Sequence, residues 1–253
     1  MGHQDTYRQN EAYAELLANC DAGFYAKYAD TLRPGVPGGR ALDVGCGVGQ
    51  VVHRLKGAGY EAQGVEVSEP SVLRARQMGL DCSPYDGRHL PFPDGCFDSV
   101  GALNVLEHVE EPEFFLGELV RVAKRGGRVL VSSPNFFRAL GWRDYHQRMR
   151  GVGNKWRNWR RLAAKRRQMR DAPEQVRFDR MAPIVKQPFT PDDDAIVATN
   201  ALEIAFFLRR AGCVIERTEC TDRQVAAPVD LLLNLTLLRY VMFNAFVVAR
   251  REG

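Results

Sequence analysis

Short apolar runs that suit buried strands alternate with segments of helical periodicity between residues 40 and 135. The pattern predicts strands at 41–45, 61–68, 80–86, 96–104 and 127–135, and helices at 50–59, 71–79 and 112–127. Glycine or proline stands at many of the boundaries between these segments. Such an alternation requires right-handed strand–helix–strand crossovers. It therefore predicts an α/β protein with a parallel sheet that is covered by helices on both faces.

The alternation is preceded by one helix, predicted at 11–32, and is interrupted once after Pro134. It resumes with a helix at 200–212, where Asn200 and Glu203 form an N-x-x-E variant of the capping box. Strands are then predicted at 213–220 and 244–250, paired with each other. We expect a single domain over residues 1–253 that contains an insert at 136–190.

The segment LDVGCGVGQ at 42–50 is the most specific motif of the chain. A strand brings Asp43 to a turn that contains Gly45, Gly47 and Gly49, and a helix follows. Glycine suits a turn where a ligand approaches the backbone or where φ is positive. The spacing is GxGxG rather than the GxGxxG of dinucleotide sites. A carboxylate two residues before the first glycine would repel a pyrophosphate and attract a cation, so the motif favours a cationic nucleoside.

Polar side chains stand at the ends of the neighbouring strands as well. Glu66 ends the second strand, where a carboxylate can accept hydrogen bonds from both hydroxyls of a ribose. Asp86 ends the third strand, where it can accept a hydrogen bond from an adenine amine, and Asn104 and Val105 follow the fourth. Ligands of open α/β sheets bind at the carboxyl ends of the strands. We therefore expect these residues to share one site with the glycine turn.

With these motifs, the sequence resembles the class I S-adenosylmethionine-dependent methyltransferases, and within them the type 11 subfamily that includes enzymes of ubiquinone and menaquinone biosynthesis. The resemblance covers roughly residues 40–135 and 200–250, and it is carried by LDVGCGVGQ, VEVSEP, YDGRHLPFPDGCFDSV, LNVLEHVEEPEFFLGELVRVAKRGGRVLVSSPN and LRRAGCVIE. It implies a Rossmann-like, mostly parallel seven-stranded sheet whose last strand is antiparallel. It also implies S-adenosyl-L-methionine as the cofactor.

The resemblance further implies a role for each matching residue. The glycine turn, with Cys46 fitted into it as a small residue, would face the methionine part of the cofactor, and Asp43 would lie near the amino group. Glu66 would hold the ribose and Val67 would pack on the adenine. The remaining residues would contact the adenine edge or, in the case of Asn104, the amino-acid part: Asp86, Gly87, Asn104 and Val105. The family more often has Gly-Asp-Ala where this chain has Tyr85-Asp86-Gly87.

The insert at 136–190 carries a net charge of +11, whereas the rest of the chain carries −7. Within it, Val152, Trp156, Trp159 and Ala163 recur at helical spacing, and arginines cover the remainder of the helix. One interpretation is an amphipathic helix whose Trp face packs on the body. The others are a lid over the cofactor that supplies cations to an anionic acceptor, an RNA-binding surface, and a helix on a membrane surface. The lid would bring substrate-binding residues from GWRDYHQRMRG: Arg143, Tyr145, His146, Arg148 and Arg150.

Two histidines are candidates for a general base in methyl transfer to a hydroxyl group. His108 follows the fourth strand in LEHVEE, and His146 lies in the insert. The chain has no Asn/Asp-Pro-Pro-Tyr/Phe motif after that strand, which disfavours methylation of the exocyclic amines of bases. Asp192, Asp193 and Asp194 have no His or Glu partner at ligand spacing, so we expect no metal site there.

The six cysteines are scattered without a CxxC pair, and the N-terminal stretch has no apolar segment of the secretory kind. We therefore expect a cytoplasmic protein. The expected activity is methylation, at oxygen, of a small or carrier-linked anionic acceptor such as a sugar, a polyketide-like compound or a quinone-type intermediate. The alternatives are an RNA methyltransferase that uses the arginine-rich insert, and a protein that binds the cofactor without turnover. The sequence leaves the acceptor and the oligomeric state open.

Overall fold

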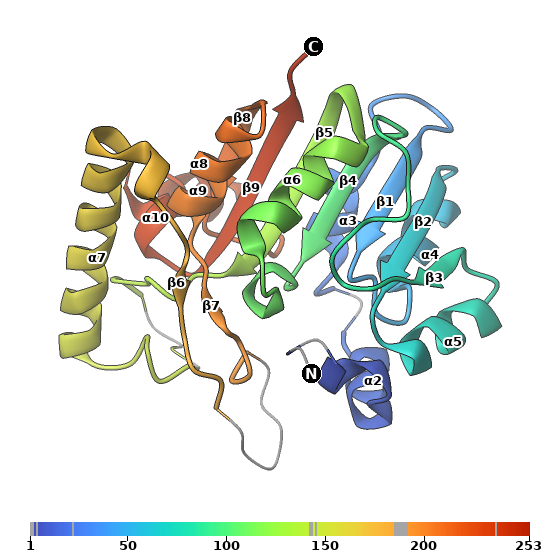
Figure 1. Cartoon of the computed structure of the whole chain (residues 1–253), viewed down its shortest axis with the longest axis horizontal. Coiled ribbons are helices and arrows are strands. Elements are labelled where there is room, and N and C mark those ends of the chain that lie inside the picture. The colour runs from blue at the N-terminus through green and yellow to red at the C-terminus, as the bar shows by residue number, and fades with distance from the viewer. Residues whose placement is uncertain are drawn as a thin grey trace.

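The computed structural model describes residues 3, 5–21, 23–141, 144, 146–184, 192–235 and 237–253. Its centre is a seven-stranded sheet with the strand order β3-β2-β1-β4-β5-β9-β8 (Figure 1). The strands are β1 (Arg40–Val44), β2 (Glu61–Glu66), β3 (Cys82–Pro84), β4 (Phe97–Leu103), β5 (Ala123–Pro134), β8 (Cys213–Glu219) and β9 (Asn244–Arg251). β9 runs antiparallel to both of its neighbours, and β1 to β5 are parallel. The predicted fold class is confirmed.

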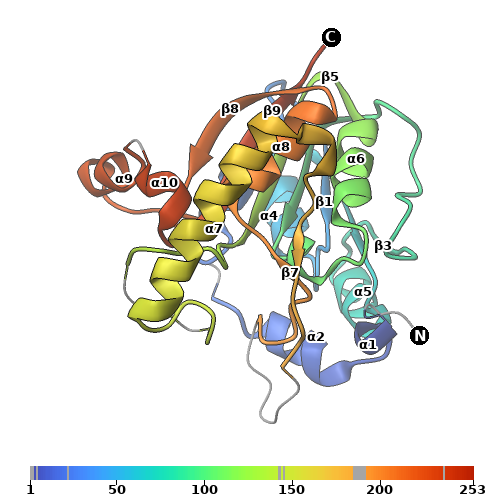
Figure 2. The same ribbon diagram turned by 60° about the vertical axis from the view of Figure 1, so that its left-hand side comes forward.

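Helices cover both faces of this sheet, as the alternation predicts (Figures 1 and 2). One face holds α3 (Ala26–Leu32), α4 (Gln50–Gly57) and α5 (Glu69–Gln77), and the other holds α6 (Pro112–Val122) and α8 (Ala201–Arg210). Successive residues of a strand point to opposite faces. Accordingly Leu130 of β5 packs in the first core, whereas Val129 and Val131 pack in the second. Burial on both faces explains why these strands are continuous apolar runs.

Two predicted helices are shorter in the structure. The predicted helix at 11–32 is divided into α2 (Glu11–Ala18) and α3, because the chain turns at Asn19–Asp21. The predicted helix at 112–127 ends at Val122, and the following residues begin β5. Ala123 pairs with Phe97, and the ladder is interrupted until Arg128 pairs with Ser99. Gly126, with φ of 73°, lies in this irregular stretch, so that glycine marks a bulge in the strand rather than a helix end.

The segment after β5 carries the long helix α7 (Val152–Asp171), the short helix η2 (Pro173–Gln175) and a two-stranded sheet of β6 (Asp179–Arg180) and β7 (Val197–Ala198). α7 packs on the body through Asn158, Leu162 and Lys165, which are its buried residues. Lys165 Nζ lies 2.8 Å from Glu203 Oε1 on α8 and 2.8 Å from Asp179 Oδ1 on β6. The interpretation in which the Trp face packs on the body is therefore wrong.

The N-terminal segment lies across the carboxyl ends of the parallel strands. It contains α1 (Asp5–Arg8) and α2, and its side chains reach α5 and the end of β3. Arg8 Nη2 donates to the carbonyl of Asp86, and Arg74 on α5 pairs with Glu11 at 3.1 Å. Two connections complete the fold. The short helix η1 (Leu106–His108) follows β4, and α9 (Ala227–Leu233) and α10 (Leu238–Val241) lie between β8 and β9 in the chain. Among the described helices, none combines the length and the apolar character that crossing a membrane requires.

Candidate active site

A cavity of about 390 Å³ lies at the carboxyl ends of β1, β2 and β4, next to α2. The glycine turn and the ends of the strands form one wall, and aromatic and aliphatic side chains from the N-terminal segment form another. Its described lining includes five carboxylates, whereas Arg223 is its one guanidinium. A cavity of this size and polarity suits a ligand that carries positive charge.

The glycine turn approaches the cavity with bare backbone at two positions. Gly45 has φ of 74° and Gly47 has φ of 53°, a region that other residues rarely adopt. A Cβ on Gly45 would lie 2.2 Å from Cγ2 of Val105, and a Cβ on Gly47 would lie 2.9 Å from Cδ1 of Leu17. Position 45 therefore requires glycine, whereas at Gly47 the positive φ disfavours other residues and the Leu17 side chain could move aside. Gly49 begins α4 and packs against Leu80, and it is not among the cavity-lining residues.

Glu66 is held rigidly at the end of β2. Its Oε2 accepts a hydrogen bond from the backbone N–H of Gly47, and its Oε1 accepts from Val67 and Ser68. Burial raises the pKa of the Glu66 carboxyl, while these three backbone N–H groups lower it. An ionised carboxylate offers about four lone-pair positions, so one remains available to a hydroxyl group of a ligand. The carboxylate thus ties the turn to β2 and can still bind a ligand.

Asp43 lies at the end of β1 and lines the same cavity. Its Oδ1 accepts a hydrogen bond of 2.9 Å from the hydroxyl of Tyr28. Burial raises the pKa of Asp43 to about 7; the Tyr28 hydroxyl lowers it and the neighbouring Glu66 raises it further. A buried carboxylate with so high a pKa is poised to ionise when a cation binds beside it. Cys46 also lines the cavity, and its contact with Cys82 and its burial raise the pKa of its thiol, which makes it a poor nucleophile.

The other predicted cofactor contacts divide into two groups. Val67, Asn104 and Val105 line the cavity together with Tyr85. Asn104 has φ of 53°, and such strain in a residue other than glycine is typical of functional sites. Asp86 and Gly87 lie outside the described lining; Asp86 Oδ1 instead accepts hydrogen bonds from the backbone of Arg88 and His89. In this structure Asp86 therefore shapes the loop after β3.

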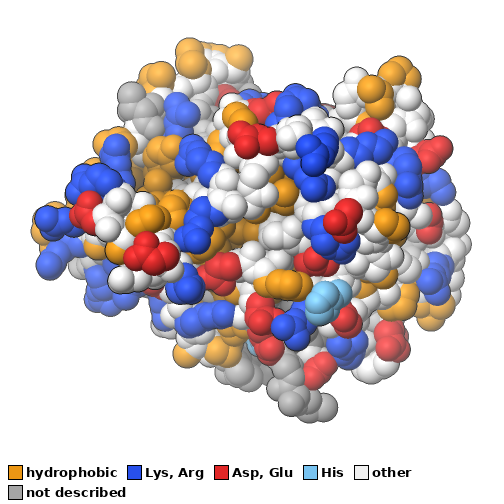
Figure 3. All heavy atoms as spheres, turned by 45° about the horizontal axis from the view of Figure 1, so that its top comes forward, with side chains coloured by type: hydrophobic (Ala, Val, Ile, Leu, Met, Phe, Trp, Pro, Cys, Tyr) orange, Lys and Arg blue, Asp and Glu red, His pale blue; other side chains and the backbone are white. Residues whose placement is uncertain are grey.

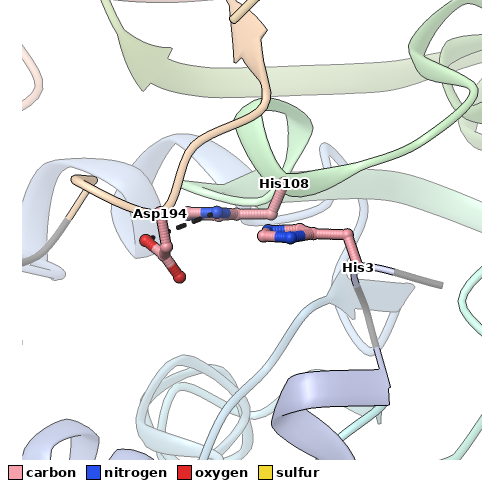
Figure 4. Close-up of side chains that lie close together, drawn as sticks. All are labelled: His3, His108 and Asp194. Atoms are coloured by element: carbon pink, nitrogen blue, oxygen red, sulfur yellow. Dashed lines mark ion pairs between the residues drawn. The ribbon is translucent and has the colours of Figure 1, made fainter. Parts of the chain in front are cut away.

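His108, on η1, lies beside Asp194 at the cavity, with Nδ1 3.8 Å from the Asp194 Oδ1 (Figure 4). The Tyr7 hydroxyl lies 3.2 Å from this Nδ1 and also donates a hydrogen bond to Asp194. The ring of His3 stacks on that of His108 with 6.2 Å between the centroids (Figure 4). Burial lowers the pKa of His108 to about 4, although Asp194 raises it. The imidazole is therefore a neutral base at physiological pH.

The acidic run after the insert does not lie in an isolated solvated loop. Asp192 and Asp194 line the cavity, and the ligand atoms of His3, His108 and Asp194 all lie within 4.8 Å of one another. The expectation of no metal there rested on the absence of a nearby His or Glu in the sequence, and the fold supplies such neighbours from distant segments. His108 and Asp194 approach each other directly at 3.8 Å, and the Tyr7 hydroxyl is hydrogen-bonded to both.

The expected substrate-binding residues of the insert do not lie at this cavity. Arg143 and Tyr145 lie outside the described residues. His146 is buried with its ring 5.1 Å from that of Phe136, and Arg148 and Arg150 pack around the start of α7. None of these three is among the residues that line the cavity. The physical reason is that α7 is fixed to α8 through Lys165, so the basic helix stands beside the cavity rather than over it.

The structure adds site residues that the sequence analysis did not consider. From the N-terminal segment they include Tyr7, Tyr13, Leu16, Leu17, Phe24 and Tyr25, and from the chain after β8 they include Arg223. Tyr13, Leu16 and Leu17 lie at helical spacing in α2, which is a signal of an apolar face. Which surface that face covers cannot be seen in the sequence. No local sequence pattern predicts that Arg223 lies at the cavity.

Comparison with known proteins identifies the family of the central segment. Residues 42–131 match the family described as "Methyltransferase domain". The ajmaline N-methyltransferase of Rauvolfia serpentina is 34% identical over 101 residues, which are 36% of this chain and 35% of that protein. The ubiquinone biosynthesis O-methyltransferase of Bordetella bronchiseptica is 34% identical over 105 residues, 39% of this chain and 44% of that protein. The chain thus matches less than half the length of either relative.

Solved structures agree over more of the chain. An S-adenosylmethionine-dependent methyltransferase from Mesorhizobium loti superimposes with a TM-score of 0.59 at 19% identity, covering 90% of this chain and 98% of that one. At this identity the likeness shows the fold. Together with the family match, it confirms the resemblance to class I S-adenosylmethionine-dependent methyltransferases and implies S-adenosyl-L-methionine as the cofactor.

Proposed function

We propose that this chain, whose residues 42–131 match the family described as "Methyltransferase domain", transfers a methyl group from S-adenosyl-L-methionine to an oxygen of a small or carrier-linked acceptor with an apolar body and an anionic group. The observation that carries the proposal is the cavity itself. It combines an acidic, glycine-lined floor at the strand ends with an apolar wall from the N-terminal segment. These two surfaces suit two different ligands bound side by side.

The residues of the floor fit the cofactor. Gly45 and Gly47 line the cavity without side chains of their own, and Glu66 has a free lone pair for a ribose hydroxyl. Asp43 would lie near the positively charged amino-acid part, where an ionised carboxylate is stabilised. Bound there, the cofactor would supply a methyl group that its own sulfonium charge activates. The task of the chain is then to align an acceptor and to exclude water.

The acceptor surface is formed by the N-terminal segment and by Arg223. Tyr13, Leu16 and Phe24 present aromatic and aliphatic surface to the cavity. The Arg223 guanidinium lies 5.2 Å from the centroid of the Phe24 ring, so its charge stands at the edge of this apolar wall. Arginine pairs with carboxylates and phosphates in a bidentate manner. An aromatic or aliphatic compound with one anionic group therefore fits this side of the cavity better than a neutral or cationic one.

The hydrogen bonds around His108 favour an acceptor hydroxyl. Burial and Asp194 raise the pKa of Tyr7 far above its ordinary range, so its hydroxyl stays protonated. This hydroxyl donates a hydrogen bond to Asp194. The Tyr7 oxygen can then accept a hydrogen bond from Nδ1–H of His108. This arrangement leaves the lone pair of the imidazole on Nε2, which lies 3.9 Å from Oε1 of the buried Glu107. In the proposed mechanism this nitrogen removes the proton from the acceptor hydroxyl. The carboxylate of Asp194 would stabilise the imidazolium that forms.

The test is a transfer assay with a labelled methyl donor. The protein would be incubated with S-adenosylmethionine labelled in its methyl group and, separately, with small-molecule and RNA fractions of a cell extract, and labelled products would be identified by mass spectrometry. We expect an anionic, partly apolar product with a new methyl ether. Arg223→Gln should raise KM for that acceptor, while Arg125→Gln, on the distant end of β5, serves as the matched control. Label that enters only RNA, or cofactor binding without any labelled product, would contradict the proposal.

A further inference from the structure

The outer face of α7 is apolar where it meets solvent. Trp156 lies about a third of a turn away from the buried Leu162, whereas Trp159 lies only about a sixth of a turn from it, at the edge between the buried and exposed sides of the helix. Trp156 is 62% exposed and Trp159 is 43% exposed. Tryptophan is among the largest apolar side chains, and two on the outside of one helix are unusual for a protein surface that meets only water.

A second apolar element lies on the same side of the molecule. The described side chains of α9 include no buried residue, although its sequence is APVDLLL. Leu231 is 67% exposed and Leu232 is 60% exposed, and Leu235 and Leu237 follow them at the surface. Figure 2 shows α9 and α10 beside α7. A short helix of this kind has too little packing of its own to explain the exposed leucines.

A groove of about 620 Å³ lies between α7 and α10, the helix that follows α9 in the chain. Trp159 lines it from α7, and Leu237 and Tyr240 line it from the other side. The inner side chain Leu162 belongs to the same core cluster as Val241, with Leu233 and Leu238 packed against it. The end of α9 is thus attached to the same cluster as the inner side of α7, through Leu233. We call α7, α9, α10 and the groove between them the α7–α9 surface.

Arginines border the apolar part of the α7–α9 surface. Arg166, Arg167 and Arg170 line the groove. Among the described residues, no ion pair joins Arg157, Arg160, Arg161 or Arg166 to a carboxylate, whereas Arg167 and Arg170 meet Asp171. The space-filling view shows Lys and Arg gathered with hydrophobic side chains at this end of the molecule (Figure 3). The surface thus combines uncompensated positive charge with exposed Trp and Leu.

We propose that the α7–α9 surface attaches the protein to the surface of an anionic phospholipid membrane. Helices with Trp and Leu on one face and Arg on the other lie at the boundary between head groups and acyl chains. Long arginine side chains can keep their charges at the phosphates while their stems cover apolar surface. Each basic residue near an anionic bilayer adds roughly 1 kcal/mol, which is about a fivefold change in partitioning.

The composition of the surface favours a bilayer over two other occupants. Single-stranded RNA would suit the arginines and tryptophans, but the leucines of α9 offer bases no aromatic face for stacking. A second copy of the chain would have to cover the surface symmetrically, which would bring the unpaired arginines of both copies together. An anionic membrane satisfies both the charge and the exposed aliphatic side chains. The proposal does not depend on methyl transfer.

The test measures partitioning into vesicles without cofactor or acceptor. The full chain would be mixed with vesicles of phosphatidylcholine alone or with phosphatidylglycerol added, and bound protein would be separated by flotation. We expect binding to the anionic vesicles that weakens with salt and a blue shift of tryptophan emission. Trp156→Ala/Trp159→Ala should weaken binding by about tenfold or more, because it removes apolar area that enters the bilayer. The matched control is Leu73→Ala on α5, an equally exposed apolar side chain elsewhere, which should leave binding unchanged.

The charge contribution has its own pair of variants. Arg160→Gln and Arg166→Gln should each weaken binding about fivefold, and Arg125→Gln, an exposed arginine far from the surface, should not. Thermal unfolding of each variant checks that the fold is kept. We expect melting temperatures close to that of the wild type, because the ends of these side chains face solvent. The proposal is overturned if anionic vesicles do not bind the protein, if neutral vesicles bind it equally well, or if the variants lose only RNA binding or self-association.

Discussion

Nδ1 of His108 lies 3.8 Å from Oδ1 of Asp194, with the Tyr7 hydroxyl hydrogen-bonded to both side chains. Three segments that are far apart in the sequence meet in this arrangement. It fixes the tautomer of a buried imidazole at the edge of the cavity. The site can therefore be tested through the protonation of His108 as well as through catalysis.

The first prediction concerns the pKa of His108. Burial holds it at about 4, below the ordinary histidine value of about 6.5, so the ring should stay neutral down to about pH 5. NMR titration of the imidazole signals, assigned with His108→Asn, measures this directly. His108 also makes stability depend on pH. Its pKa is about 6.5 in the unfolded chain and about 4 in the folded protein, so between these values the proton binds to the unfolded chain only. This residue therefore lowers the free energy of unfolding as the pH falls from about 6.5 towards 4. A His108 pKa near 6.5 would contradict the described burial.

With an acceptor in hand, His108→Asn should lower kcat by about 10²- to 10⁴-fold, the usual contribution of a general base. Tyr7→Phe and Asp194→Asn should lower it less, because Tyr7 orients the ring and Asp194 stabilises the imidazolium without taking up the proton itself. If His108→Asn has the same kcat as the wild type, His108 is not the general base.

The second prediction concerns the pH dependence of cofactor binding. Because burial raises the pKa of Asp43 to about 7, the carboxyl must lose its proton when a cation binds beside it. The affinity for S-adenosylmethionine should be constant above pH 7 and fall by up to about tenfold per pH unit below it. Calorimetry at pH 7 in buffers of different ionisation enthalpy should detect the released proton. In Asp43→Asn the release should vanish; if it persists unchanged, another group is responsible.

The third prediction concerns the glycine turn. Gly45→Ala places a Cβ 2.2 Å from Val105 at a positive φ, and should lower the free energy of unfolding by about 1–3 kcal/mol and weaken cofactor binding. Gly57→Ala is the control, since no heavy atom lies within 4 Å of its new Cβ and it belongs to α4. Alanine in a helix should stabilise by about 0.5–1 kcal/mol relative to glycine. Denaturant unfolding of both variants measures the contrast, and equal effects would argue against a strained turn.

The fourth prediction concerns the attachment of α7. Lys165 pairs with Glu203, whose side chain has no solvent exposure, and burial raises the pKa of Glu203 to about 7 even though Lys165 lowers it. Lys165→Met would leave this carboxylate without its partner and should cost about 3–5 kcal/mol of stability. The double variant Lys165→Met/Glu203→Leu should recover most of that loss, whereas Arg167→Met at the exposed surface should change stability by less than about 1 kcal/mol. A mild effect of Lys165→Met would show that α7 is held in another way.

The sequence was sufficient to predict the sheet and the residues at the ends of β1, β2 and β4 that line the cavity. Strand and helix periods and the Asn200 cap are local signals, and the sheet order and the cap confirm them, whereas the glycine stop predicted at Gly126 lies inside β5. Asp43, Glu66 and Asn104 were brought together by one rule, that parallel strands end at the same edge of a sheet. The predicted helix end at 127 was wrong, and α6 ends at Val122 because the strand pairing of Ala123 with Phe97 outweighs the helical propensity of the following residues.

The rest of the site depends on packing between distant segments. Hydrophobicity alone suggested that Trp156 and Trp159 face the body, but the buried pair of Lys165 and Glu203 turns another face of α7 inward. In the same way, no spacing in the sequence connects Tyr7 with Asp194 or places Arg223 at the cavity. Such contacts become visible only when the order of the strands and the path of the N-terminal segment are known.

The central claim is that the strand-end cavity binds S-adenosylmethionine, and calorimetric titration of the intact protein tests it most directly. We expect saturable binding to one site in the wild type at neutral pH, and a loss of at least about tenfold in affinity in Asp43→Ala, because the variant lacks the carboxylate that faces the cation. The absence of binding by the folded wild-type protein, or equal affinity in Asp43→Ala, would contradict the account.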